Sequence, residues 1–98
     1  MTIFCGLIAG RHILPDVITD NVFSTDIPQI HITDSAYMDR ICNEFLDRHP
    51  EADTIAVYVS GFTPALLALI KACANRNLHL TAYNFDREGR TFWSQEVL

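Results

Sequence analysis

The fold is decided by residues 55–85, IAVYVSGFTPALLALIKACANRNLHLTAYNF, in which two apolar runs flank a short polar loop and a helical run. The first run is rich in β-branched and aromatic side chains, which favours a buried strand. Thr63 as the cap and Pro64 at the first helical position predict a helix over 64–75, and residues 78–85 predict the next strand. This order forms a βαβ unit, so we expect two parallel strands joined by a right-handed crossover.

Further strands are predicted on both sides of this unit. Thr2–Ile8 is apolar on both faces, which is typical of a central strand. Pro15 and Asp16 favour a short helix that runs to about Val22, and Pro28–Thr33 alternates apolar and polar residues as a strand does. Gly89 suits a hairpin turn with a positive φ, after which residues 91–95 return antiparallel as an edge strand.

A second helix is predicted after residue 33, with Thr33, Asp34 or Ser35 as its cap and His49-Pro50 at its end. Its apolar positions recur at helical spacing: Tyr37, Met38, Ile41, Cys42, Phe45 and Leu46. The sequence therefore predicts one α/β domain over residues 1–98. We expect a small three-layer, Rossmann-like domain with a mainly parallel sheet and an antiparallel C-terminal edge hairpin.

Composition restricts the classes of partner. The 98 residues carry a net charge of −5, which argues against a binder of duplex nucleic acid. No apolar run reaches membrane-spanning length and no signal peptide is recognisable, so we expect a cytoplasmic protein without a membrane partner. Cys5, Cys42 and Cys73 each lie in an apolar segment and are expected to be buried, reduced thiols. The helix at 64–75 is apolar almost all round, so we expect a second subunit to cover it in a homodimer.

A binding site is expected where parallel strands end, because ligands of such sheets collect beyond the carboxyl ends of the strands. Gly10, Arg11 and His12 follow the first strand; Ser60, Gly61, Phe62 and Thr63 follow the strand before the 64–75 helix; Asn84 ends the next strand. Free amides at a helix start favour phosphates. Arg11 would contact the phosphate and His12 would act as an acid or base. Alternatively, the second loop is only a capped helix start, and Arg11-His12 is a solvated pair.

Other site chemistry has little support in the sequence. The four histidines and three cysteines show no metal-ligand spacing, and we expect neither a metal nor a cofactor. His31, His49 and His79 are interpreted as structural or solvated residues.

Residues 55–66, IAVYVSGFTPAL, resemble the ligand loop of CRISPR-associated Rossmann-fold (CARF) domains, and also the small CRISPR ring nucleases. Those families bind cyclic oligoadenylates across a symmetric dimer, and the ring nucleases cleave them without a metal. The resemblance implies that Ser60–Thr63 and Arg11 hold the phosphate while His12 moves a proton. Their usual pattern has a second glycine and a lysine where this chain has Phe62 and Pro64, so Arg11 would supply the basic contact.

Three interpretations follow. The first is a homodimer, implicated in antiviral defence, that binds a cyclic oligoadenylate or related small nucleotide; whether it also cleaves the ligand as a metal-independent phosphodiesterase is left open. The alternative is a non-enzymatic adaptor that works through its apolar helix at 64–75 or its edge strand at 91–95. The third is a sensor that binds a small molecule without turnover.

Overall fold

A five-stranded mixed sheet forms the centre of the domain in a computed structural model that describes residues 1–10, 14–18 and 20–98. The strand order is β2-β1-β3-β4-β5. The four strands from β2 to β4 are parallel, and β5 pairs antiparallel with β4. The bounds are β1 (Thr2–Ile8), β2 (Asn21–Phe23), β3 (Thr54–Tyr58), β4 (His79–Asp86) and β5 (Thr91–Glu96). The predicted α/β class, mainly parallel sheet and antiparallel C-terminal hairpin are confirmed.

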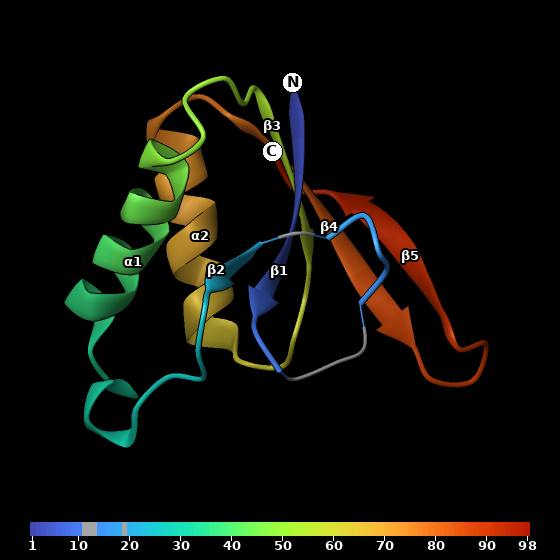
Figure 1. Ribbon diagram of the computed structural model, residues 1–98, viewed down its shortest axis with the longest axis horizontal. Helices are drawn as coiled ribbons and strands as arrows, with labels where there is room; N and C mark the ends of the chain where they lie inside the picture. Colours follow the sequence, from blue (N-terminus) through green and yellow to red (C-terminus); the bar gives the residue numbers. More distant parts are fainter. Residues whose placement is uncertain (11–13, 19) are drawn as a thin grey trace.

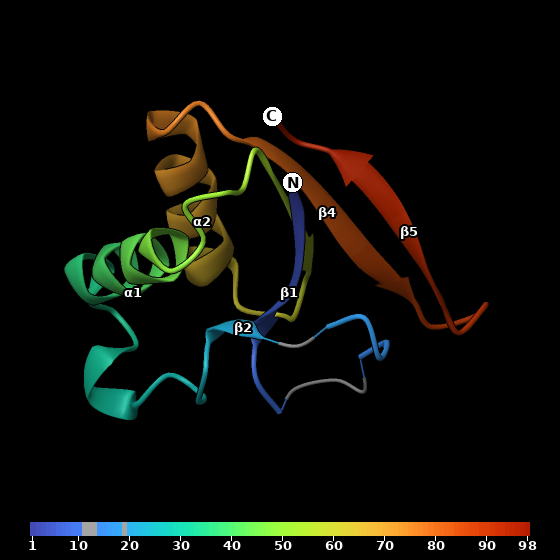
Figure 2. The same cartoon turned by 45° about the horizontal axis from the view of Figure 1, so that its top comes forward.

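Two helices, α1 (Ser35–Asp47) and α2 (Thr63–Asn75), lie side by side on one face of this sheet (Figures 1 and 2). On the opposite face the described residues place an irregular segment, not a helix. A side chain at Gly6 would lie 2.7 Å from the Leu14 Cδ1 atom, so Leu14 packs directly over β1. The third layer of the domain is therefore a connecting loop.

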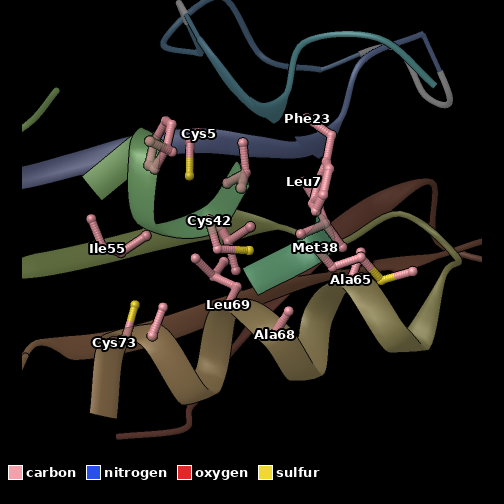
Figure 3. Close-up of a cluster of buried hydrophobic side chains, with 14 of the residues drawn as sticks. Cys5, Leu7, Phe23, Met38, Cys42, Ile55, Ala65, Ala68, Leu69 and Cys73 are labelled. Atoms are coloured by element: carbon pink, nitrogen blue, oxygen red, sulfur yellow. The ribbon is translucent and has the colours of Figure 1, made fainter. Parts of the chain in front are cut away.

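The main core lies between the helices and the sheet (Figure 3). Leu7, Ile55, Phe45 and Leu69 come from four different elements, and each is 0% exposed. Full burial of a side chain of this size stabilises the fold by about 1.5–3 kcal/mol. Because α1 packs along α2, the second apolar side of α2 is covered within the chain. The apolar character of α2 therefore no longer requires a second subunit.

The three cysteines are free and buried in this core, as predicted. Burial raises the pKa of the Cys42 thiol on α1 to about 12 and that of the Cys73 thiol on α2 to about 11. Burial also raises the pKa of Cys5 on β1. All three thiols are therefore held in the protonated form at neutral pH.

Three predicted local features are wrong. The described residues between Pro15 and Val22 form no helix, contrary to expectation; residues 16–17 form a turn, and buried Val22 and Phe23 belong to the short strand β2 beside β1. The expected strand at 28–33 is a 3-10 helix, η1 (Gln29–His31), because the His31 N–H bonds back to the Pro28 carbonyl at 2.8 Å. In the hairpin turn the positive φ, 52°, belongs to Arg90 rather than to Gly89.

Candidate functional site

The loops that follow β1 and β3 meet at one end of the sheet, which we call the carboxyl end. The buried Ser60 hydroxyl accepts a hydrogen bond from the Ile8 N–H at 3.2 Å, which ties the end of β3 to the end of β1 (Figure 1). Beside it, the Val59 N–H donates to the Tyr83 carbonyl of β4 at 3.0 Å. The ends of β1 and β3 therefore lie side by side, as expected, while the loop after β1 is described only as far as Gly10.

Ser60 has a structural contact that its sequence position did not reveal. Only 4% of the residue is exposed, and its oxygen satisfies a strand amide that would otherwise be buried without a partner. The hydroxyl proton is not used by this bond and can still be donated. Ser60 therefore holds the two loops together, while its contact with a ligand stays a prediction.

The start of α2 has no side-chain cap, although Thr63 was expected to provide one. The cap position is Phe62, with φ −130° and ψ 96°, and its carbonyl accepts from the Ala65 N–H at 3.1 Å. Thr63 lies one position inside the helix, where its hydroxyl no longer reaches the first-turn amides as a cap does. Pro64 has no N–H, and the Phe62 N–H donates to the Ser60 carbonyl at 2.7 Å, so among the described residues the Thr63 N–H is the donor of this helix start that is left for another group.

Space is open beside this helix start. Gly61 is exposed, and a side chain added there would meet no atom within 4 Å. Gly10, after β1, is also exposed and open, and it has a φ of 79° that favours glycine. The backbone of both loops can therefore be approached closely by a ligand.

The remaining predicted site residues are placed less favourably or not at all. Asn84 is half-buried on β4, and its side-chain amide donates to the side-chain Oε1 of Gln95 at 3.4 Å within the hairpin. Arg11 and His12 lie outside the described residues, so their roles stay predictions. Phe62 is half-buried and packs against the core beside the helix start.

His31 and His49, expected to be outward-facing and solvated, both form contacts within the fold. His31 stacks on Tyr37 with ring centroids 4.1 Å apart, and the His49 Nε2 lies 3.4 Å from the Asp20 carboxylate. Within residues 1–10, 14–18 and 20–98, no group of three or more His, Cys, Asp or Glu side chains is arranged to hold a metal ion.

A groove between α1 and α2, which we call the inter-helix groove, was missed by sequence reasoning. Its volume is about 390 Å³, and its lining includes Ile32, Met38, Asp39, Leu67, Ala68 and Lys71. Leu67 is 58% exposed although it is apolar. A leucine at helical spacing is indistinguishable from a core residue in the sequence, so nothing in the pattern indicated this hollow.

An aromatic patch covers the sheet face opposite the helices, at Tyr58, Tyr83, Phe85 and Phe92. Tyr58 stacks on Tyr83 with centroids 4.6 Å apart, and Phe92 meets Tyr58 edge-on at 4.8 Å. Phe85 contacts Phe92 at 5.3 Å and is 42% exposed. This side of the sheet therefore presents aromatic surface to its surroundings. Trp93, which follows Phe92 on β5 and pairs with Asn84, lies on the other face of the sheet and is 52% exposed.

No helix among the described residues is long and apolar enough to cross a membrane. Comparison of the chain with protein-family models, with curated proteins and with solved structures gives no match.

Proposed function

We propose that this protein binds a cyclic oligoadenylate, or a related small cyclic nucleotide, at the carboxyl end of its sheet, and that it does so as a homodimer. The observation that carries the proposal is the start of α2, which has no side-chain cap and opens beside Gly61. The end of β1 is held close to it through the Ile8–Ser60 hydrogen bond.

A phosphate is the group that such a helix start binds best. The helix dipole favours an anion there by about 0.3–1 kcal/mol when exposed and up to about 2 kcal/mol when partly buried. A charge-assisted hydrogen bond from Arg11 would add about 1.5–3 kcal/mol. The net charge of −5 is spread over the surface and is screened beyond about 8–10 Å, so it does not outweigh these local terms.

A two-fold dimer would present two copies of the carboxyl end to a ring that itself has repeated phosphates. Cleavage would need no metal: the 2′-hydroxyl oxygen bonds to the neighbouring phosphorus as the bond to the 5′-oxygen breaks. His12 would take the 2′-hydroxyl proton, and the departing 5′-oxygen would gain one. The Thr63 N–H at the start of α2 would stabilise the charge on the phosphate oxygens.

Calorimetric titration with cyclic tri-, tetra- and hexa-adenylate, followed by mass spectrometry of the ligand, tests this proposal. We expect one ring to bind with micromolar or tighter affinity and to bind at least about tenfold more weakly to Gly61→Asp, which places a carboxylate at the phosphate position. Gly61→Asn is the matched neutral control and should retain binding. A conversion to linear product would show turnover, whereas an unchanged mass would show a sensor. Equal binding to Gly61→Asp and Gly61→Asn would contradict the proposal.

A second candidate function, an adaptor that acts through β5, is favoured by the exposed ring of Trp93 on one face of that strand and by the aromatic patch, which includes Phe92, on the other face. β5 is the last strand in the sheet order, so its outer edge can pair with an extended segment of a partner. A partner identified by affinity purification should be lost from Trp93→Lys, while nucleotide binding stays intact. Retention of that partner by the variant would exclude the β5 route.

A further inference from the structure

The inter-helix groove combines apolar walls with one charged pair. Met38 on α1 and Leu67 and Ala68 on α2 are among the residues that line it. Asp39 and Lys71, which also line it, form an ion pair across the two helices at 2.6 Å. The volume of about 390 Å³ falls within the range of about 300–1,000 Å³ that is usual for small-molecule sites.

The Asp39–Lys71 ion pair can form further hydrogen bonds with the polar edge of a ring. The bond between the Lys71 Nζ and the Asp39 Oδ2 uses one of three ammonium protons and one of two carboxylate oxygens. The remaining Oδ1 can accept a hydrogen bond, and the remaining Nζ protons can donate one. A hydrogen-bond donor, the Lys71 ammonium, and an acceptor, the Asp39 carboxylate, thus lie side by side in the wall of an apolar groove.

The groove lies at the same end of the molecule as the proposed phosphate position. It is lined by Ser35 in the first turn of α1 and by Pro64 in the first turn of α2. Pro64 directly follows Thr63, the first residue of the uncapped helix. A ligand whose phosphate lies at the start of α2 can therefore extend along that helix into the groove.

We propose that the inter-helix groove binds a nucleobase of the nucleotide whose phosphate occupies the start of α2; this rests on the proposed function. The flat ring packs against Leu67 and Met38. Asp39 accepts a hydrogen bond from the exocyclic amine, and Lys71 donates one to the adjacent ring nitrogen. Adenine carries this amine and nitrogen side by side on one edge.

An apolar partner, such as a leucine side chain from another protein, fits the groove less well. It would cover the Asp39–Lys71 pair without replacing the water that solvates it, and burial of such charges without new hydrogen bonds is costly. A base covers the same apolar area and satisfies both charged groups.

The probe for a direct test is adenosine, which has no phosphate, and the readout is the methyl spectrum of protein labelled at its two methionines, Met1 and Met38. Met38 lines the groove, whereas Met1 is 66% exposed and serves as the internal reference. A base stacked in the groove should move the Met38 methyl signal upfield through the ring current, in a saturable manner, and leave Met1 unchanged. An unmoved Met38 signal at millimolar adenosine would overturn the inference, even if cyclic oligoadenylate binds elsewhere.

Variants separate this inference from the proposed function. Leu67→Trp fills the groove at an exposed position and should weaken adenosine and cyclic oligoadenylate binding at least about tenfold. Ala74→Trp places the same ring at another exposed position of α2, outside the groove lining, and should bind as the wild type does. Thermal unfolding confirms that both variants fold. Equal binding to the two variants would overturn the groove proposal, while loss of cyclic oligoadenylate binding in Gly61→Asp alone would leave only the phosphate site.

Discussion

The two helices begin at the same end of the molecule, but only one of them has a side-chain cap. At the start of α1, the Asp34 carboxylate accepts a hydrogen bond from the Tyr37 N–H at 3.1 Å. At the start of α2, Phe62 occupies the equivalent position and no side chain caps the helix. The comparison shows that the start of α1 is capped by a side chain, whereas the start of α2, next to the carboxyl end, leaves the Thr63 N–H open as a donor among the described residues.

The difference between the helix starts does not arise from looser packing. Both helices have 13 residues and both contribute fully buried side chains to the same core, such as Cys42 from α1 and Leu69 from α2. Surface ion pairs join the two helices along their length, from Lys71 to Asp39 at 2.6 Å and, where both helices end, from Arg76 to Asp47 at 2.8 Å. Exposed pairs like these add little stability, but they fix how the helices lie.

The largest expected effect is on the reactivity of the Cys42 and Cys73 thiols, which tests whether both helices stay packed against the core. The pKa of Cys42 is raised from 9.0 to about 12, so its thiolate population at pH 8 should be about a thousandfold lower than in the unfolded chain. For Cys73, at about 11, the factor is about a hundredfold. Labelling by a thiol-disulfide reagent should be correspondingly slow in buffer and fast in urea. Rapid native labelling of Cys73 alone would show that α2 frays and that its start is not a built site.

The same pKa values set the direction of the pH dependence. The folded state holds the thiol protons more tightly, so the unfolded state loses protons first as the pH rises above 9.0. The free energy of unfolding should therefore be unaffected by these groups below pH 9 and should fall between pH 9 and about 12.

Removal of the Ile8–Ser60 hydrogen bond should have the next largest effect, which is on the free energy of unfolding. Ser60→Ala leaves the Ile8 N–H without its partner in a buried position, which should lower the free energy of unfolding by about 1–3 kcal/mol. Ser60→Thr keeps the hydroxyl and is the matched control. Urea unfolding measures both. An unchanged stability in Ser60→Ala would mean that the loops are held together by other contacts.

Removal of the side-chain cap of α1 should have a smaller effect, which should be confined to the free energy of unfolding. Asp34→Ala removes the acceptor for the Tyr37 N–H and should lower the free energy of unfolding by about 0.5–2 kcal/mol. Nucleotide affinity should not change, since this helix start is not the proposed phosphate position. Asp34→Asn, which retains an acceptor oxygen, should recover most of the stability. A large loss of nucleotide affinity in Asp34→Ala would show that the ligand binds at the start of α1 and not at the start of α2.

The smallest expected effects distinguish the two exposed glycines. The φ of Gly61 is not in the positive range and its surroundings are open, so Gly61→Ala should stabilise the fold by about 0.4–1 kcal/mol. Gly10 has a φ of 79°, so Gly10→Ala should destabilise it by about 1–2 kcal/mol. Differential scanning calorimetry of the two variants checks the signs. Destabilisation by Gly61→Ala would show that its backbone needs glycine for the fold itself.

Much of the architecture was predictable because its signals are local. Asp34 was among the three expected caps of α1, and the βαβ unit around residues 54–86 follows from apolar runs separated by a helix with a proline in its first turn. The meeting of the loops at the carboxyl end follows from parallel strand order, and the Ile8–Ser60 contact agrees with it.

The parts that could not be predicted depend on contacts between distant segments. β2 has only three residues, and its pairing with β1 is decided by burial of Val22 and Phe23 rather than by a periodic pattern. Thr63 before a proline has the composition of a cap, yet the helix begins one residue earlier. The inter-helix groove depends on how Met38 and Leu67 face each other across two helices, which no single segment encodes.

The amide spectrum of the protein, recorded with and without cyclic tetra-adenylate, tests the central claim most directly. If α2 begins as an open phosphate site, the Gly61 and Thr63 amide signals should shift on titration, whereas the Tyr37 amide, which is already bonded to Asp34, should stay in place. Unmoved Gly61 and Thr63 signals at saturating ligand, or a shift that is largest at Tyr37, would contradict the account.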